Sequence, residues 1–169
     1  NAGDGRVIMK NIYFYHTDIG VIGIAEDGKA VTDLYFQGEQ TPEDAFIAET
    51  EILKEAGRQL RAYLAGKLRK FTLPLAPSGT EFMLRVWKSL LTIPYGETRS
   101  YQEIAQSVGN KKASRAVGLA NNRNPIPIII PCHRVIGSNG KLIGYGGGLH
   151  LKSYLLELEK ATLAKGDMR

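Results

Sequence analysis

Long hydrophobic runs and cysteine are both scarce in this sequence, and each scarcity excludes a class of protein. The longest apolar runs, such as residues 126–131, fall far short of the roughly 20 residues that a membrane-spanning helix needs. The single cysteine, Cys132, can form no intramolecular disulfide and cannot supply the clustered thiolates of most structural zinc sites. Three scattered histidines do not replace those thiolates. We therefore expect no transmembrane segment, no metal and no cofactor.

The lone thiol and the N-terminal residues also bear on the compartment. An unpaired thiol fits a reducing compartment better than a secreted protein. We expect a cytoplasmic protein, associated with the nucleoid in a bacterium and nuclear in a eukaryote. Residues 1–6 are small and polar and lack the apolar region of a secretory signal. We interpret them as a remnant ahead of Met9 and leave them out of the fold argument.

The charge is unevenly distributed along the chain. The formal net charge is +5, but residues 1–79 carry nine Lys/Arg against eleven Asp/Glu, whereas residues 80–169 carry thirteen against six. Between Arg99 and Lys152 there are eight basic residues and one acidic residue, Glu103. This clustering predicts a face that binds a polyanion. On charge alone, an ordinary solvated basic surface is the alternative.

The first half of the sequence predicts an antiparallel sheet followed by a helix. Apolar and polar residues alternate in three short runs separated by turn-like residues, at 12–15, 21–25 and 31–36. A helix is predicted to begin at Thr41, a good N-cap, because proline and two carboxylates follow it. The helix should end at Gly66. Residues 71–75 are a candidate for a further strand.

A linker-like segment containing proline and glycine ends near residue 79, where the charge balance changes sign. We place a domain boundary there. Residues 1–79 form the predicted sheet-and-helix domain, and residues 80–169 form the predicted C-terminal domain. The predicted fold class is α+β, with a small N-terminal antiparallel sheet domain and a helical C-terminal domain.

The C-terminal domain begins with a predicted helix over residues 82–91, whose apolar residues follow helical spacing. Residues 100–103 form a capping-box sequence, so a short helix should begin at Tyr101 and end at Gly109. A second helix is predicted over residues 111–121. Two such helices joined by a glycine-containing turn outline a helix-turn-helix, although helical hairpins also occur in folds that bind no DNA.

The most informative segment is residues 124–137, in which an apolar run with three prolines delivers a thiol and an imidazole to a rigid turn. Proline fixes φ and lacks an amide donor, so this segment suits a preformed pocket wall better than a central strand. A lone cysteine is most often a small buried hydrophobe. Cys132 and His133 are poorly placed to share one metal, because adjacent extended residues face opposite ways. The sharper hypothesis is a nucleophilic thiol activated through His133.

The run Pro131-Cys132-His133-Arg134-Val135-Ile136-Gly137 resembles the active-site motif of the O6-alkylguanine-DNA alkyltransferases, also called methylated-DNA-protein-cysteine methyltransferases. The resemblance covers the second half of the chain, and the first half matches only in its order of elements, which in the family form a small ribonuclease H-like sheet with a helix. The further matching blocks, in order, are Tyr95-Gly96-Glu97, Ser100-Tyr101, residues 112–118, Asn124-Pro125-Ile126-Pro127 and residues 145–149.

The resemblance implies a reaction and a set of roles. Cys132 would take a methyl or other alkyl group from O6-alkylguanine in double-stranded DNA, with O4-alkylthymine as a second candidate, and keep it irreversibly after a single turnover. His133 would remove the thiol proton through a bridging water, and Glu159 would orient that histidine. Tyr101 would help to rotate the damaged base out of the duplex and donate to guanine N3, and Arg115 would fill the vacancy.

The remaining implied residues fall into two groups. The second helix would enter the minor groove, where small residues suit close approach and sequence is read poorly. Its implied DNA-binding residues, besides Arg115 and Tyr101, are Lys112, Ala116, Gly118 and Ala120. The implied pocket residues are Asn124, Pro127, Val135, Tyr145, Gly146 and Gly147. We expect a monomer that binds double-stranded DNA containing alkylated bases and no membrane.

Two features limit the resemblance, and two other functions compete with it. Gly146 stands where some relatives carry serine and Ile143 where others carry glycine, so the accepted alkyl size stays open. One cysteine is too few for a four-cysteine sensor domain, so no adaptive-response role is expected. The first competing function is lesion binding without repair, as in alkyltransferase-like proteins, which lack the acceptor cysteine. The second is a helix-turn-helix regulator with a structural cysteine.

Overall fold

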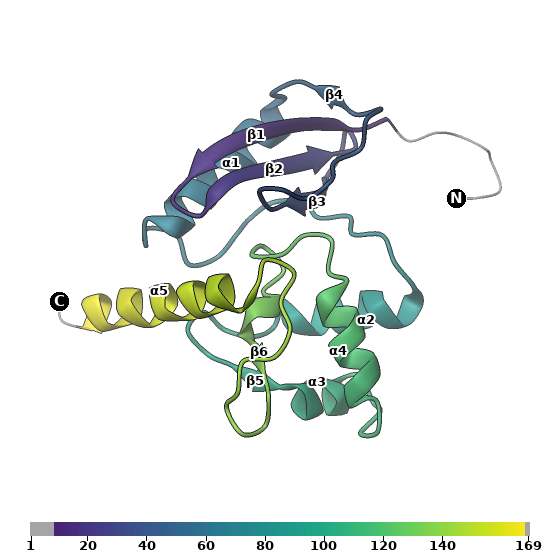
Figure 1. The fold of residues 1–169 in the computed structure, drawn as a ribbon, viewed down its shortest axis with the longest axis vertical. Coiled ribbons are helices and arrows are strands. Elements are labelled where there is room, and N and C mark those ends of the chain that lie inside the picture. Colours follow the sequence, from purple (N-terminus) through teal and green to yellow (C-terminus); the bar gives the residue numbers. More distant parts are fainter. Residues whose placement is uncertain (1–8, 168–169) are drawn as a thin grey trace.

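The computed structural model describes residues 9–167, so our interpretation of residues 1–6 lies outside the described part of the chain. A small sheet with one helix forms the upper half of the molecule in Figure 1, and the remaining helices form the lower half. This arrangement confirms the predicted α+β fold class. No helix in residues 9–167 is long and apolar enough to span a membrane. The first four elements after the N-terminus are the strands β1 (Asn11–Thr17), β2 (Gly20–Glu26), β3 (Val31–Tyr35) and β4 (Phe46–Ile47).

The predicted antiparallel meander is confirmed. β1 pairs with β2, and β2 pairs with β3, both antiparallel. The strand order is β3-β2-β1-β4, because β4 adds to the outer edge of β1 in parallel through residues 46 and 47. The sequence did not indicate β4, which is too short to show any alternation. β3 is therefore an edge strand, and Figure 1 shows it as the strand nearest the lower half.

The first helix, α1 (Glu51–Leu64), begins nine residues later than predicted. Its N-cap is Thr50, whose side chain accepts from the Leu53 amide, and not Thr41. The chain after residue 41 makes a turn into β4, so tertiary pairing with β1 overrides the local helix-start signal. The end of the helix is as predicted, because Gly66 follows it with φ +73°.

The free edge of β3 is covered by other parts of the chain. The predicted strand at residues 71–75 is not a strand, and only Leu75 forms an isolated bridge, to Val31. Backbone hydrogen bonds join Val31 to residues 74 and 76 on either side of that bridge. Further along β3, the Leu34 amide donates to the Pro125 carbonyl at 2.8 Å. Covering an edge in this way satisfies its amides and protects it from pairing with other chains.

The lower half contains α2, α3, α4 and α5 together with a second, two-stranded sheet of β5 and β6. α2 is close to its prediction, and α3 begins with the predicted capping box, in which Ser100 and Glu103 exchange hydrogen bonds. α4 begins three residues later than predicted, because the chain after Asn110 makes a turn instead of a helical start. The bounds are α2 (Glu81–Leu90), β5 (Arg99–Ser100), α3 (Tyr101–Ser107), α4 (Ser114–Asn122), β6 (Val135–Ile136) and α5 (Leu149–Asp167).

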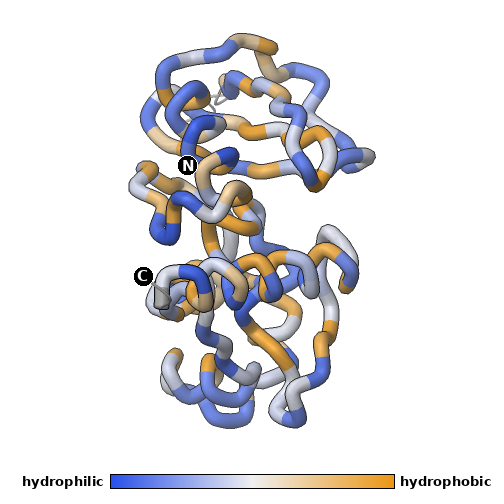
Figure 2. Tube along the Cα trace, turned by 90° about the vertical axis from the view of Figure 1, so that its left-hand side faces the viewer, coloured by the Kyte–Doolittle hydropathy of each residue, from blue (hydrophilic) through white to orange (hydrophobic). Residues whose placement is uncertain are grey.

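The two halves share one continuous hydrophobic core. Buried residues of the sheet and α1 belong to the same cluster as Trp87 on α2 and Leu155 on α5. The Trp87 indole donates to the Ala120 carbonyl at 2.8 Å, which fastens α2 to α4. Figure 2 shows hydrophobic segments recurring in both halves of the chain. This shared core holds the segment between α4 and α5, which carries the thiol, against the sheet.

Candidate active site

The segment between α4 and Cys132 is held by side-chain hydrogen bonds and contains one strained residue. Asn124 lies two residues after the end of α4, donates from Nδ2 to the Ile130 carbonyl at 2.8 Å and accepts from the Ile126 amide at 3.0 Å. Ile128 has φ +73° and is the only non-glycine residue with positive φ in residues 9–167. Such a conformation costs a β-branched residue about 1–3 kcal/mol and persists only where the surroundings enforce it. The segment is therefore preformed, as its prolines predicted.

Cys132 begins a short 3₁₀ turn, Cys132–Arg134, and is 3% exposed. Its carbonyl accepts from Asn121 Nδ2 at 3.2 Å, which fixes the turn to the end of α4. Burial raises the pKa of the Cys132 thiol to about 11, against smaller lowering effects from Asn124 and Lys152. The sulfur is therefore a protonated thiol at neutral pH, and a nucleophilic role requires that a base remove its proton.

His133 follows the cysteine and is fully buried. Its Nε2 lies 2.7 Å from Glu159 Oε2. Burial lowers the pKa of His133 and outweighs the raising effect of Glu159, so the ring is neutral at pH 7. A neutral ring whose Nε2 donates to Glu159 keeps Nδ1 unprotonated. His133 Nδ1 is buried and has no hydrogen-bond partner within residues 9–167, which makes it a free proton acceptor.

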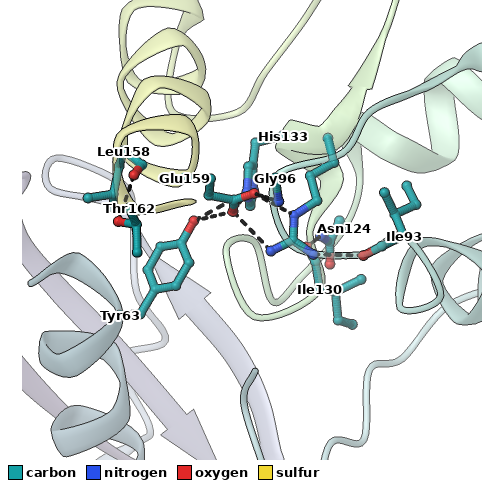
Figure 3. Close-up of polar contacts among 10 residues, drawn as sticks. Tyr63, Ile93, Gly96, Asn124, Ile130, His133, Leu158, Glu159 and Thr162 are labelled. Carbon is teal, nitrogen blue, oxygen red and sulfur yellow. Dashed lines mark hydrogen bonds and ion pairs between the residues drawn. The ribbon is translucent and has the colours of Figure 1, made fainter. Parts of the chain in front are cut away.

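Glu159 lies at the centre of a buried charged network, drawn in Figure 3. Arg134 donates to both carboxylate oxygens, from Nε at 2.9 Å and from Nη2 at 2.9 Å. Tyr63 donates to Oε2 at 2.6 Å and the Gly96 amide donates to Oε1 at 2.9 Å. Burial alone would raise the pKa of Glu159, but the hydrogen bonds from His133 and Arg134 lower it to about 2. The carboxylate therefore stays ionised and holds the imidazole in one orientation.

The inward face of α5 carries ionisable residues among its apolar ones. Leu155 is fully buried, Leu151 and Leu158 are partly buried against the core, and Tyr154 is 39% exposed. The fully buried positions on α5 are Lys152, Leu155 and Glu159, spaced at i, i+3 and i+7. Two of the three are ionisable, so an apolar pattern alone does not reveal them.

Lys152 is a buried lysine that the sequence analysis missed. Its Nζ donates to the Val135 carbonyl at 2.5 Å and to the Ile143 carbonyl at 2.9 Å. Burial lowers the pKa of Lys152 to about 8. The amine thereby links β6 to the loop before α5, and both segments border the cysteine.

Tyr101 reaches the site through the small second sheet. β5 pairs in parallel with β6, with Arg99 opposite Val135, and Tyr101 follows β5 directly. The Tyr101 hydroxyl donates to the Ile143 carbonyl at 2.8 Å, so it already has a partner in this state. Burial, with a further contribution from Cys132, raises the pKa of Tyr101. The hydroxyl is therefore a proton donor at neutral pH.

A cavity of about 130 Å³ opens beside the sulfur. It brings together four predicted residues, Asn124, Pro127, Cys132 and Gly146. Its wall also includes residues from the N-terminal half that the sequence analysis did not implicate: Asp33, Leu34, Tyr35, Phe36 and Glu39. A larger cavity of about 710 Å³ borders Arg134 but not the cysteine, so the smaller one is relevant to thiol chemistry.

The other predicted pocket residues do not line this cavity. Val135 is fully buried, Tyr145 and Gly147 are half-buried, and the Tyr145 hydroxyl has no hydrogen-bond partner in the described chain. A Cβ added at Gly146 would meet no atom within 4 Å. Steric crowding therefore does not explain glycine at that position.

The predicted DNA-facing residues divide by exposure. Arg115, Ala116 and Lys112 are exposed and Gly118 is partly exposed. Ala120, in contrast, is 1% exposed and lies on the face of α4 that packs against Trp87. Its side chain is therefore not available to a ligand at the surface of α4. Leu119 takes an outward position instead and is 49% exposed.

Three further residues of the site escaped the sequence analysis as functional candidates: Tyr63, Arg134 and Lys152. Arg134 lies within the matched motif and could have been found there. Lys152 precedes Glu159 by seven residues, a spacing that puts both on one helix face. Tyr63 lies on α1, far from the matched motif in the sequence, and gave no local signal. Within residues 9–167, no cluster of three or more His, Cys, Asp or Glu side chains could hold a metal ion.

Fold and site together define an α+β protein with a buried Cys-His-Glu arrangement and, on α4, an exposed arginine, Arg115. The chain matches two family models: "6-O-methylguanine DNA methyltransferase, ribonuclease-like domain" over residues 12–77 and "6-O-methylguanine DNA methyltransferase, DNA binding domain" over residues 81–161. The protein belongs to the 6-O-methylguanine DNA methyltransferase family.

Curated relatives and solved structures agree with this assignment. The chain is 55% identical over 148 residues to a methylated-DNA--protein-cysteine methyltransferase of Methanosarcina acetivorans, covering 86% of this chain and 95% of that relative. It is 57% identical over 145 residues to the corresponding protein of Mycobacterium leprae, covering 84% and 87%. A crystal structure of Mycobacterium tuberculosis OGT in complex with DNA superposes with a TM-score of 0.85 at 49% identity, covering 90% of this chain and 94% of that one.

Proposed function

We propose that the protein repairs alkylated DNA by transferring the alkyl group of O6-alkylguanine irreversibly to its own Cys132. The observation that carries this proposal is the buried thiol beside a neutral imidazole that is hydrogen-bonded to an ionised carboxylate. The names of the relatives, methylated-DNA--protein-cysteine methyltransferases, support the same reaction. O4-alkylthymine is a second candidate substrate.

The reaction breaks the bond between guanine O6 and the alkyl carbon and forms a bond between that carbon and the sulfur. His133 Nδ1 accepts the thiol proton through a bridging water, and Glu159 stabilises the imidazolium that results. The departing guanine gains negative charge, which Tyr101 offsets by donating to N3. Because the Tyr101 hydroxyl donates to Ile143 in this state, it must exchange partners when the base enters. A thioether is not readily cleaved, so each molecule acts once.

The target base must leave the duplex before the sulfur can reach it. The pair α3 and α4 acts as the helix-turn-helix, with α4 in the minor groove and Arg115 entering the base stack in place of the extruded base. Lys112, Ala116 and Gly118 contact the backbone and groove on the exposed face of α4. Minor-groove binding with basic side chains suits a repair protein, because damage occurs in any sequence context.

The pocket would recognise the extruded base mainly through the backbone. The Gly146 amide donates to O6, and the carbonyls of Cys132 and Val135 accept from the exocyclic amine. Tyr145, Pro127 and Gly147 shape the pocket. Asn124 acts as the hinge between α4 and the cysteine, which its two hydrogen bonds to residues 126 and 130 support.

We also propose that residue 79 separates two domains, of residues 1–79 and residues 80–169. The substrate in this proposal is genomic DNA and the thiol must stay reduced, so the protein acts inside the cell, in the cytoplasm, at the nucleoid or in the nucleus. We further propose that it acts as a monomer.

The test is intact mass spectrometry after incubation with duplex DNA containing O6-methylguanine. The expected result is one added methyl group on a peptide containing Cys132, with unmodified DNA product. Cys132→Ala should bind the same DNA and show no adduct. DNA binding without an adduct in the unaltered protein would favour lesion recognition without repair. Sequence-selective binding that does not require Cys132 would favour a regulator.

A further inference from the structure

We propose that Phe36, from the N-terminal half, determines how large an alkyl group Cys132 can accept. This inference rests on the proposed alkyl transfer. It assigns one wall of the pocket to a residue that the second half of the chain does not supply. Phe36 follows β3, lines the same 130 Å³ cavity as Cys132 and is 8% exposed.

Two sets of hydrogen bonds hold Phe36 at the pocket. β3 is fixed to the active-site segment by the bond from the Leu34 amide to the Pro125 carbonyl, at 2.8 Å. The turn that follows is closed twice, because the Phe36 amide donates to Glu39 Oε1 at 2.8 Å and the Glu39 amide donates to the Phe36 carbonyl at 3.0 Å. The backbone of Phe36 is thus positioned on both sides, and its ring is directed by packing.

The ring of Phe36 packs against the loop that precedes α5. Its centroid lies 5.9 Å from that of Tyr145, with the two planes tilted by 52°. A Cβ added at Gly147 would lie 3.1 Å from Phe36 Cε2 and 2.6 Å from Leu151 Cδ2. Phe36 therefore occupies the space beside Gly147 and limits outward movement of Tyr145. Gly147 and Tyr145 are two of the residues that would shape the pocket.

Because the cavity is small, the position of the Phe36 ring affects which alkyl groups can fit. At about 130 Å³, it is smaller than the roughly 300–1,000 Å³ of typical small-molecule sites. A methyl group adds little to the space that the base requires, but a benzyl group must displace a wall or find room beside it. Where a substrate group meets an apolar side chain, one extra or missing methylene changes the rate by about 10- to 200-fold, and a benzyl group exceeds a methyl group by more than one methylene. A smaller side chain at position 36 should therefore favour the bulkier substrate selectively.

The experiment compares the unaltered protein with Phe36→Ala, Phe36→Leu and the control Phe14→Ala. Phe14 lies on β1, is 36% exposed and does not line the cavity. Duplex DNA with O6-methylguanine and duplex DNA with O6-benzylguanine are reacted separately under single-turnover conditions. The rate constant for the Cys132 adduct is followed by intact mass. The readout is the ratio of the benzyl rate to the methyl rate, which a general loss of stability would not raise.

We expect the ratio to rise about 10-fold or more in Phe36→Ala, to rise less in Phe36→Leu and to stay unchanged in Phe14→Ala. An unchanged ratio in Phe36→Ala, with methyl transfer intact, overturns the inference and leaves the proposed function standing. If Phe36→Ala does not fold, the same criterion is applied to Phe36→Leu. Absence of any adduct in the unaltered protein overturns the proposed function and this inference together.

Discussion

Replacing Glu159 with glutamine should destabilise the fold by about 3 kcal/mol at pH 7. The amide keeps the shape of the side chain but removes the negative charge that receives two bonds from Arg134. Breaking a buried ion pair by removing one partner costs about 3–5 kcal/mol, because the other charge stays buried and uncompensated. The pKa of Glu159 gives a similar figure, since a shift from 4.5 to about 2 corresponds to about 3 kcal/mol.

The sign of the pH dependence provides a second test. The folded-state pKa of Glu159 is lowered, so its contribution is fully present above about pH 4.5 and is lost as the pH falls toward 2. Glu159→Gln should therefore differ most from the unaltered protein at neutral pH, and the difference should shrink in acid. The rate of alkyl transfer should also fall, because His133 loses the group that orients it.

Urea denaturation at pH 7 and in acid measures both effects. With a slope of about 2 kcal/mol per molar urea, the midpoint at pH 7 should drop by roughly 1.5 M. Glu157→Gln is the matched control, because Glu157 is an exposed carboxylate on the same helix. Equal midpoints for Glu159→Gln and the unaltered protein at pH 7 would refute the reasoning about the buried charge.

Three further experiments test other parts of the site. Tyr63→Phe removes the 2.6 Å hydrogen bond to Glu159 and should cost about 1.5–3 kcal/mol of unfolding free energy; a urea midpoint equal to that of the unaltered protein would show the bond to be unimportant. Because burial raises the pKa of Cys132 to about 11, labelling of the DNA-free protein by iodoacetamide should accelerate about tenfold per pH unit between about pH 7 and pH 10, and a plateau near pH 7 would contradict this. Arg115→Ala should slow transfer from duplex DNA by about tenfold or more while sparing reaction with free O6-benzylguanine, because unstacking a base costs a few kcal/mol. Arg123→Ala, an exposed neighbour beyond α4, is the control for lost positive charge, and equal slowing with duplex and free base would count against base extrusion by Arg115.

Features that depend on neighbours in the sequence were predictable. The capping box before α3, the glycine after α1 and the three alternating strands each follow from contacts within a few residues. The rigidity of the segment before Cys132 also follows from its prolines, although the strained φ of Ile128 does not. The resemblance in the second half identified the cysteine, the histidine and Glu159 as a group. Without it, the cysteine would have been interpreted as a buried thiol and Glu159 as a helical carboxylate.

Features that depend on distant parts of the chain were not predictable. Thr41 and Thr50 are both good N-caps, and only the pairing of β4 with β1 decides between them. Lys152 on α5 is buried because three carbonyls accept from its amine, which no apolar pattern reveals.

The sequence by itself determined the reactive group of this protein, because a thiol, its neighbouring imidazole and the proline-bound turn that carries them are contiguous in the chain. The tertiary structure decided the environment of that group. Tyr63 and Phe36 come from the N-terminal half and meet α5 and the cysteine cavity only after folding. Burial and charge pairing, which set the pKa values of Cys132 and Glu159, are properties of that assembled interior and not of any local stretch of residues.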